Sequence, residues 1–227
     1  MKIGNLLLIL LLGMNFYPES LHSAISPVEK PIRIPFRYVQ SFIVVEVYIE
    51  HLFPLNLIFD TGAEHTILFD RRWTDVFSEA YQREIKVIGS DLQTELPAML
   101  TKPMSLIFGN RFQGETPLII LEQNQTNISQ VIGEPVHGIL SASLFSNFVL
   151  QVDYKNRTLV LHPINTRPPA GYHEMNIQVH KQKPYLLTEV KSTQYSSHQL
   201  NLLIDTGASL SLLLYLDSFS NLMMPNQ

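Results

Sequence analysis

Two aspartates in this sequence, Asp60 and Asp205, stand in nearly identical surroundings. Each ends an apolar run, and each is followed by threonine, glycine and alanine. The nine-residue windows 55–63 and 200–208 are identical at seven positions, and the two differing positions keep an apolar residue. Such repetition indicates an internal duplication, so we expect the same strand and loop to occur twice in the fold.

The chemistry available to this pair follows from the position of each carboxylate at the end of an apolar strand. A buried carboxylate is costly to leave unpaired, so it needs hydrogen-bond donors or a second group that shares its proton. If the two loops face each other, Asp60 and Asp205 come into contact, and like charges about 3 Å apart cannot both ionise. One carboxyl then stays protonated while the other acts as a base toward a water held between them. Such proton transfer is general acid–base hydrolysis of an amide.

The rest of the sequence predicts a mainly β protein that holds these loops. Short runs rich in β-branched and aromatic residues alternate with turn formers, which is typical of strands. The expected strands are 42–49, 55–60, 104–109, 116–122, 148–154, 157–163, 184–190 and 198–205. Two stretches are expected to be helical instead, Arg71 to Arg83 and Ala142 to Phe148.

Proline and glycine divide the chain into two unequal units. The segment "PINTRPPAG" at 163–171 has no apolar periodicity, and it predicts a linker at 164–171. The first unit is expected at 32–163 and forms one complete lobe. The second unit, 172–227, contains only the N-terminal half of a lobe. We therefore expect either a missing C-terminal portion that completes the second lobe or a homodimer in which two chains pair their first units.

With these motifs, the sequence resembles the retropepsin-like aspartic proteases, in particular bacterial exported aspartyl proteases with tandem Asp-Thr-Gly units. The resemblance implies that a complete lobe is a closed β-barrel of the retropepsin or pepsin kind. It also implies an aspartic endopeptidase that needs no cofactor or metal and cleaves peptide or protein substrates through a water activated by Asp60 and Asp205. Four loop-bracing residues are implied beside this catalytic pair: Thr61, Gly62, Thr206 and Gly207.

The resemblance extends downstream to residues 136–163, where a family unit has a hydrophobic-hydrophobic-glycine turn followed by a helix and a hairpin. In this chain Ser141 follows Ile139 and Leu140, where the family usually has glycine. Serine would be strained at this position if the backbone needed a positive φ. By the same layout, we expect the substrate-covering flap to be a hairpin near 86–97.

The N-terminus and the composition indicate where the protein works. Residues 1–24 have the shape of a secretory signal peptide, with a lysine, about ten apolar residues and then small and polar residues. This apolar stretch is too short to span a bilayer comfortably, so no stable membrane span is expected. The absence of cysteine favours an exported protein in a periplasm or outside the cell, without disulfides. A net charge of −4 and scattered basic residues argue against a nucleic-acid partner.

Two alternatives to an intramolecular enzyme stay open. If Asp205 is not held opposite Asp60, the chain is a catalytically inactive or peptide-binding retropepsin-like protein. If two chains pair their first units, the enzyme is active only as a homodimer with two copies of Asp60. In each motif the alanine after glycine, Ala63 or Ala208, offers no hydroxyl to the carboxylate. We therefore expect a pair that keeps its proton to higher pH and works at mildly acid to neutral pH.

Overall fold

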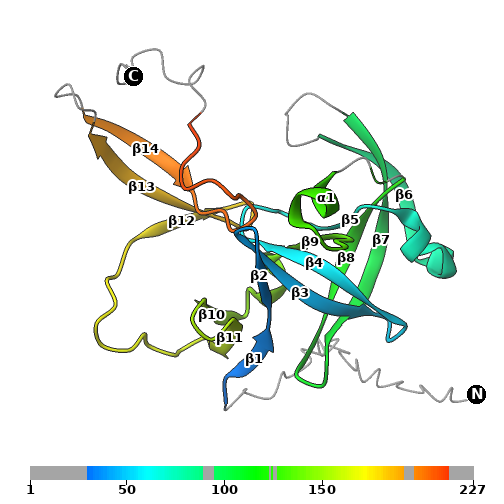
Figure 1. The fold of residues 1–227 in the computed structure, drawn as a ribbon, viewed down its shortest axis with the longest axis horizontal. Coiled ribbons are helices and arrows are strands. Elements are labelled where there is room, and N and C mark those ends of the chain that lie inside the picture. Colours follow the sequence, from blue (N-terminus) through cyan, green and yellow to red (C-terminus); the bar gives the residue numbers. More distant parts are fainter. Residues whose placement is uncertain (1–29, 89–94, 123, 125–126, 192–196, 215–227) are drawn as a thin grey trace, which may run out of the picture.

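The computed structural model describes residues 30–88, 95–122, 124, 127–191 and 197–214, and this part of the chain is mainly β, as predicted. Its strands form three sheets (Figure 1). The largest sheet contains β2 (Arg37–Val39), β3 (Phe42–Ile49), β4 (Phe53–Asp60), β5 (Thr66–Leu68), β6 (Tyr81–Ile88), β7 (Glu95–Phe108), β8 (Phe112–Leu121) and β9 (Gly138–Ser141). The second contains β1 (Ile32–Pro35), β10 (Phe148–Asp153) and β11 (Thr158–Pro163). The third contains β12 (Ile177–His180), β13 (Lys183–Lys191) and β14 (Ser197–Leu203).

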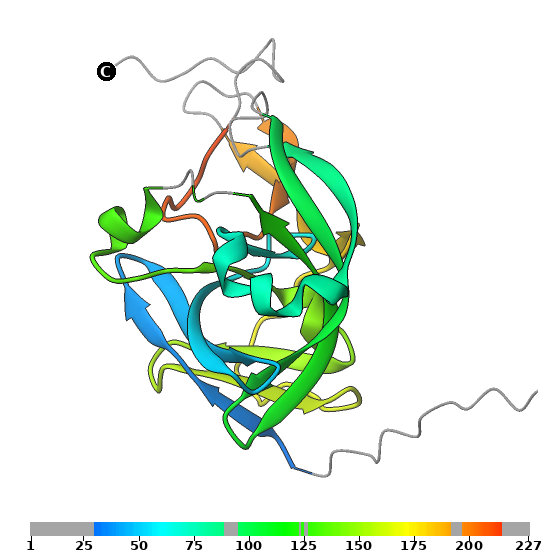
Figure 2. The same ribbon diagram turned by 90° about the vertical axis from the view of Figure 1, so that its right-hand side faces the viewer.

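Six strands of the largest sheet close into a barrel. The strands lie in the order β2-β3-β4-β9-β5-β8-β7-β6, and β3 also pairs with β7, which joins the two sides. The closed ring therefore runs β3-β4-β9-β5-β8-β7, and this confirms the expected mainly β fold with a closed barrel. Figure 2 shows the long, curved hairpin of β6 and β7 along one side of the barrel.

Apolar side chains fill the barrel because they alternate along its strands. In β3 and β4, the buried residues of the main core recur at every second position, since successive side chains point to opposite faces of a strand. They are Ile43, Val45, Val47, Ile49, Leu55, Leu57 and Phe59. Asp60 follows Phe59, so its side chain leaves the strand on the side away from this core. The first motif therefore begins where a barrel strand ends.

β9 lies between β4 and β5 and holds the end of β4 in place. It pairs in parallel with β4 and antiparallel with β5, the two strands that flank the loop 61–65. This close approach needs glycine at the start of β9, because a Cβ atom on Gly138 would collide with the carbonyl oxygen of Ile67. The register places Asp60 opposite Ser141. The first aspartate is therefore delivered by a strand end that is paired with β9.

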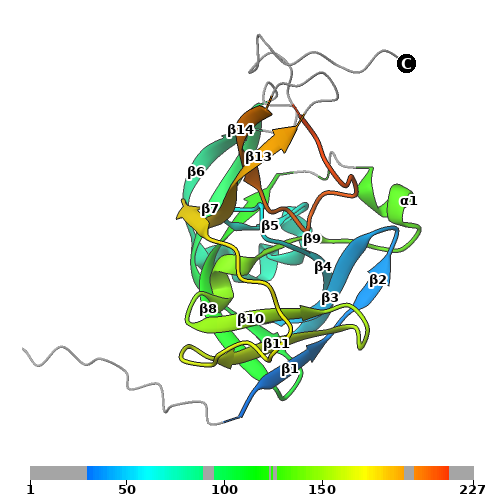
Figure 3. The same ribbon diagram turned by 90° about the vertical axis from the view of Figure 1, so that its left-hand side faces the viewer.

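The two smaller sheets lie apart from each other, with β13 and β14 above β1, β10 and β11 in Figures 1 and 3. In one, β11 pairs with both β1 and β10. In the other, β13 pairs with both β12 and β14, which leads into the second motif. Several apolar side chains of this sheet are about half exposed or more, among them Ile177, Val179 and Leu187.

The helix predicted from Arg71 to Arg83 is wrong in its last part. Two short 3-10 helices, η1 (Arg71–Trp73) and η2 (Asp75–Ala80), occupy the start of the segment, and β6 begins at Tyr81. The side chain of Asp70 accepts a hydrogen bond from the backbone of the first turn. Local side-chain bonds of this kind offer the backbone an alternative to a regular α-helix.

The second predicted helix, Ala142 to Phe148, is also too long. Only the 3-10 helix η3 (Ala142–Phe145) forms, because β10 already begins at Phe148. The helix α1 (Ile128–Ile132) was not predicted, since five residues are too few for an apolar period to be recognised. It ends at Gly133, whose φ of 83° is the left-handed conformation common at helix C-termini.

Some expectations fall outside the described residues or are untested by them. The predicted signal peptide at 1–24, the tip of the predicted flap at 89–94 and the end of the second unit from 215 onward belong to the first group. The division of the chain at 164–171 stays a prediction. In the part of the chain that the structure describes, no helix has both the length and the apolar character required to cross a membrane.

Candidate active site

The loops that follow β4 and β14 face each other and exchange hydrogen bonds. The backbone N–H of Thr61 donates to Oγ1 of Thr206, and the backbone N–H of Thr206 donates to Oγ1 of Thr61, both at 3.1 Å. The Thr61 hydroxyl in turn donates to the carbonyl of Ile204 at 2.6 Å. The Thr206 hydroxyl donates to the carbonyl of Phe59 at 3.0 Å. These bonds join the ends of two distant strands within one chain.

The motif glycines lie against the carboxyl groups of the opposite loops. A Cβ atom added to Gly62 would lie 2.7 Å from Cγ of Asp205. A Cβ atom added to Gly207 would overlap Cγ of Asp60. Only glycine leaves this space empty, so each loop approaches the aspartate of the other closely. The structure thus brings together all six residues that the sequence indicates: Asp60, Thr61, Gly62, Asp205, Thr206 and Gly207.

Asp60 is the more enclosed of the two carboxyl groups. The backbone N–H of Gly62 donates to its Oδ1 at 2.6 Å, and the backbone of Ala63 provides a further hydrogen bond. Burial, followed by the charge of Asp205 and a hydrogen bond with it, outweighs these donors and raises the pKa of Asp60 to about 7. A carboxyl group with this pKa keeps its proton at mildly acid pH.

Asp205 is more open to solvent. Its Oδ1 accepts a hydrogen bond from the backbone N–H of Gly207 at 2.8 Å, which is the counterpart of the bond inside the first loop. The residue is exposed, and Leu210, Leu212 and Leu213 downstream of it are each more than half exposed. An enclosed carboxyl beside an open one suits a pair in which one group gives a proton and the other accepts one.

Ser141 joins the site from β9, a role that the sequence analysis missed. Its backbone is extended, with a φ of −69° and a ψ of 139°, so the position does not impose the strain expected for a positive φ. Its Oγ donates to the carbonyl of Ala63 at 2.7 Å, and its N–H donates to Oγ1 of Thr66 at 3.1 Å. The sequence does contain a sign of this role. Ser141 stands where the family usually has glycine, and the serine adds a hydroxyl beside the motif.

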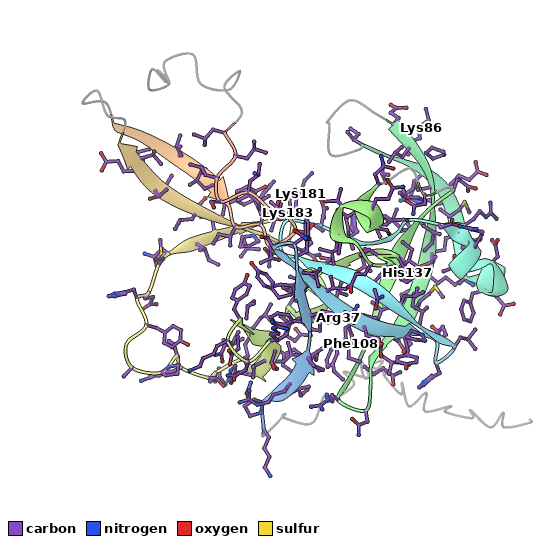
Figure 4. All side chains as sticks on the ribbon, in the orientation of Figure 1. Arg37, Lys86, Phe108, His137, Lys181 and Lys183 are labelled. Carbon is purple, nitrogen blue, oxygen red and sulfur yellow. The ribbon has the colours of Figure 1, made fainter. Side chains whose placement is uncertain are left out.

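The hairpin expected near 86–97 is formed by β6 and β7. Lys86 pairs with Pro97 across the hairpin, and its ammonium group lies 2.7 Å from a carboxylate oxygen of Glu95. Figure 4 places Lys86 near the outer end of this hairpin. Because its tip at 89–94 lies outside the described residues, the function of the hairpin as a flap stays a prediction.

Other features of the described residues offer less chemistry. No group of three or more histidine, aspartate or glutamate side chains there is arranged to hold a metal ion. A pocket of about 600 Å³ is lined by residues of β6 and β7 together with Arg71 and Glu122, and neither motif aspartate belongs to it. The facing aspartates are therefore the best candidate for a reactive site.

The strands that lead into the two motifs pair in the same way. Ile58 and Leu203 each stand two positions before a motif aspartate. Residues opposite one another are Arg37, Val44 and Ile58 across β2, β3 and β4, and Gln178, Tyr185 and Leu203 across β12, β13 and β14. In both sets a two-residue turn with positive φ joins the first two strands, at 40–41 and at 181–182. The two aspartates are thus delivered by strands with the same register.

No family model matches this chain, and no curated protein matches it. Among solved structures, it is similar to a retropepsin-like aspartic protease from Rickettsia conorii. This similarity has a TM-score of 0.40 and a sequence identity of 14%, and it covers 58% of this chain and 98% of that chain. At this level of similarity, function has to be inferred from the geometry of the two loops.

Proposed function

We propose that this protein is an aspartic endopeptidase that hydrolyses peptide bonds through a water activated by Asp60 and Asp205. The mutual bracing of the two loops carries the proposal. Thr61 and Thr206 bond to each other, and each motif glycine lies against the opposite carboxyl group. Two unrelated surface turns would not need hydrogen bonds to each other. Two carboxyl groups that share a proton do need a fixed separation, because the distance between them decides whether both can ionise.

The first step is attack by a water held between the two carboxyl groups. Asp205, as a carboxylate, takes a proton from the water while the water oxygen bonds to the carbonyl carbon of the scissile peptide. Asp60 gives its proton to the carbonyl oxygen. The raised pKa of Asp60 supports this division of roles, because burial and the nearby charge favour its protonated form. The intermediate is a tetrahedral diol that is not covalently attached to the protein.

The second step breaks the peptide bond. Asp205 returns its proton to the amide nitrogen, which leaves as an amine when the carbon–nitrogen bond breaks. Asp60 takes a proton back from a hydroxyl of the diol, and that oxygen becomes the carbonyl of the new carboxylic acid. Water and an amide are consumed, an acid and an amine are formed, and both aspartates return to their starting states.

We also propose that the protein is exported and that its motifs come from an internal duplication. The common strand registers support the duplication. The sequence of residues 1–24 supports export with removal of the signal peptide. Cell fractionation followed by N-terminal sequencing tests this. A mature chain that begins near residue 25 in the periplasm or the medium agrees with export, and an intact N-terminus in the cytoplasm contradicts it.

A peptide-binding protein without hydrolytic activity is the second candidate. The exposure of Asp205 and of the leucines that follow it favours this candidate, because an open loop excludes water less completely from a bound peptide. Such a protein would still hold an extended peptide against the loops. It would leave the peptide uncut.

Incubation with an unbiased peptide library separates the two candidates. The mature protein and the Asp60→Asn/Asp205→Asn double variant are incubated from about pH 3 to about pH 7.5, and new termini are identified by mass spectrometry. Cleavage by the wild type that is lost in the double variant supports the endopeptidase. Peptide capture without new termini supports the binding protein. Equal cleavage by both proteins contradicts the proposed pair.

A further inference from the structure

Ser141 places a buried hydroxyl beside the loop of the first motif. In the pairing of β4 with β9 it lies opposite Asp60, and its side chain is fully buried. β9 also pairs with β5, so Ser141 ends a strand that lies between the two ends of the loop 61–65. The mechanism proposed above gives this hydroxyl no task.

The shortest contact of the Ser141 hydroxyl is with the loop of the first motif. A hydroxyl has one proton to donate and can accept two hydrogen bonds. The carbonyl of Ala63, at 2.7 Å, is its nearest acceptor, whereas the carbonyl of Glu64 is farther away at 3.4 Å. The hydroxyl oxygen of Ser143, at 2.8 Å, is a second acceptor for the same proton. The backbone N–H of Ser143 donates to Oγ of Ser141 at 3.1 Å.

Ala63 is therefore held from two sides. Its carbonyl is held by Ser141, and its backbone also bonds to the carboxyl of Asp60 beside the N–H of Gly62. Donors that face a carboxylate stabilise its ionised form and lower its pKa. The carbonyl of Ala63 belongs to the peptide group that follows these donors. Its release would free the backbone torsion of Ala63, and the loop that carries the N–H groups could then shift away from the carboxyl.

We propose that Ser141 is a positioning residue for Asp60, because its hydroxyl holds the carbonyl of Ala63 and so fixes the loop backbone that aims the N–H groups of Gly62 and Ala63 at the carboxyl. The consequence for catalysis rests on the proposed function. The consequence for the carboxyl itself does not, since it can be measured in a protein that cleaves nothing.

The test is the pKa of Asp60 in Ser141 variants, measured by NMR titration of ¹³C-labelled aspartate. In Ser141→Ala the pKa should rise by roughly half a unit to one unit, because the N–H donors are less well aligned. Ser141→Cys fills nearly the same space with a weak donor, so it should shift the pKa in the same direction and by less. If the enzyme is active, kcat should fall about tenfold with KM almost unchanged, and the alkaline limb of the pH profile should move to higher pH, because Asp60 acts in its protonated form.

Ser129→Ala is the matched control. The Ser129 hydroxyl donates to the carbonyl of Val136 at 3.1 Å and accepts from its N–H at 3.0 Å, so it ties α1 to the segment before β9. Its loss should lower stability without shifting the pKa of Asp60. A wild-type pKa in both Ser141 variants, or an equal shift in Ser129→Ala, overturns the proposal. If the wild type cleaves no peptide, the proposed function fails, and the titration still decides the role of Ser141.

Discussion

Thr61 and Thr206 hold each other, because the backbone N–H of each donates to the side-chain oxygen of the other at 3.1 Å. The two residues are 145 positions apart, so this contact joins two distant segments of the chain beside the two carboxyl groups. Each hydroxyl also donates its own proton to a backbone carbonyl. The two loops therefore stabilise each other, and a substitution in either loop should displace both carboxyl groups.

Replacement of either threonine by valine should lower both the stability of the protein and its activity. Thr61→Val leaves the carbonyl of Ile204 and the N–H of Thr206 without their partner, which costs about 1–3 kcal/mol in the free energy of unfolding. A displaced loop should also lower kcat/KM roughly a hundredfold. Because the two threonines share hydrogen bonds, the double variant should lose less free energy of unfolding than the sum of the losses in Thr61→Val and Thr206→Val.

Urea unfolding and peptide cleavage measure both effects. Thr116→Val is the control, since its exposed hydroxyl makes only a contact of 3.4 Å with the carbonyl of Pro117. This control should stay close to the wild type in both measurements. Strictly additive costs for the two site threonines would show that the loops act independently, contrary to the structure.

Adding one methyl group to either motif glycine should separate the carboxyl groups. Alanine at position 62 or 207 would place its Cβ against the opposite aspartate, within 2.7 Å of Cγ in the case of Gly62→Ala. Cleavage should fall at least a hundredfold. Gly109→Asn is the control, because this residue has a φ of 59° and no atom near its missing Cβ, and asparagine tolerates that conformation. Near-normal kcat in Gly62→Ala or Gly207→Ala would argue against the close approach of the loops.

The raised pKa of Asp60 makes stability depend on pH in a definite direction. The folded state holds this proton up to a pH of about 7, whereas the unfolded chain releases it near 3.8. Between these values the folded state binds more protons, so the free energy of unfolding falls as the pH rises. Asp60→Asn has no carboxyl group to titrate at this position, so it does not lose this part of the free energy of unfolding as the pH rises. The variant should be more stable than the wild type at pH 7.5, by about 1–2 kcal/mol after allowance for partial exposure.

Urea unfolding at two pH values checks this sign. The difference between Asp60→Asn and the wild type should vanish near pH 4, where the carboxyl of the wild type is protonated in the folded state. Asp153→Asn is a control of opposite sign, because hydrogen bonds from Asn156 lower the pKa of Asp153. This variant should be less stable than the wild type at pH 7.5. Asp60→Asn with lower stability than the wild type at pH 7.5 would contradict the assignment.

The close contact of β9 with β5 should make Gly138 sensitive to any side chain. A Cβ atom at this position would collide with the carbonyl of Ile67, and backbone cannot move aside cheaply. Gly138→Ala should cost more than about 3 kcal/mol or prevent folding. In Gly114→Ala the new atom meets Cδ1 of Leu144 at 2.9 Å, the flexible end of a side chain, so the cost should stay under about 1.5 kcal/mol. Equal unfolding midpoints for the two variants would refute this reasoning.

Much of the fold could be predicted because the signals are local. The run of β-branched and aromatic residues in "FIVVEVYI" predicts β3 with the bounds that the structure has, 42–49. The repeated Asp-Thr-Gly motif also predicts that Asp60 and Asp205 come together. The helix from Arg71 to Arg83 failed because local side-chain bonds favour 3-10 turns and because β6 pairs with β7 already from Tyr81.

The bracing contacts could not be predicted in this detail, because they depend on register between distant segments. The identity of the carbonyl that accepts a hydrogen bond from the Thr61 hydroxyl depends on how far β14 extends toward β4. The tie from Ser141 to Ala63 requires β9 to run in parallel with β4 and to end beside Asp60. A tripeptide motif carries no information about either distance. The residue types did indicate the kind of contact, since threonine and serine supply hydroxyl groups for hydrogen bonds and glycine allows a close approach of the backbone.

The most direct test of the central claim is the cleavage rate of Asp60→Asn, Asp205→Asn and an equimolar mixture of the two variants, measured on one peptide that the wild type cuts. If Asp60 and Asp205 form one intramolecular pair, each variant should lose at least a thousandfold in kcat, and the mixture should stay as inactive as its components. Activity that survives Asp205→Asn, or that returns in the mixture, would show that the pair forms between two chains and would contradict the account.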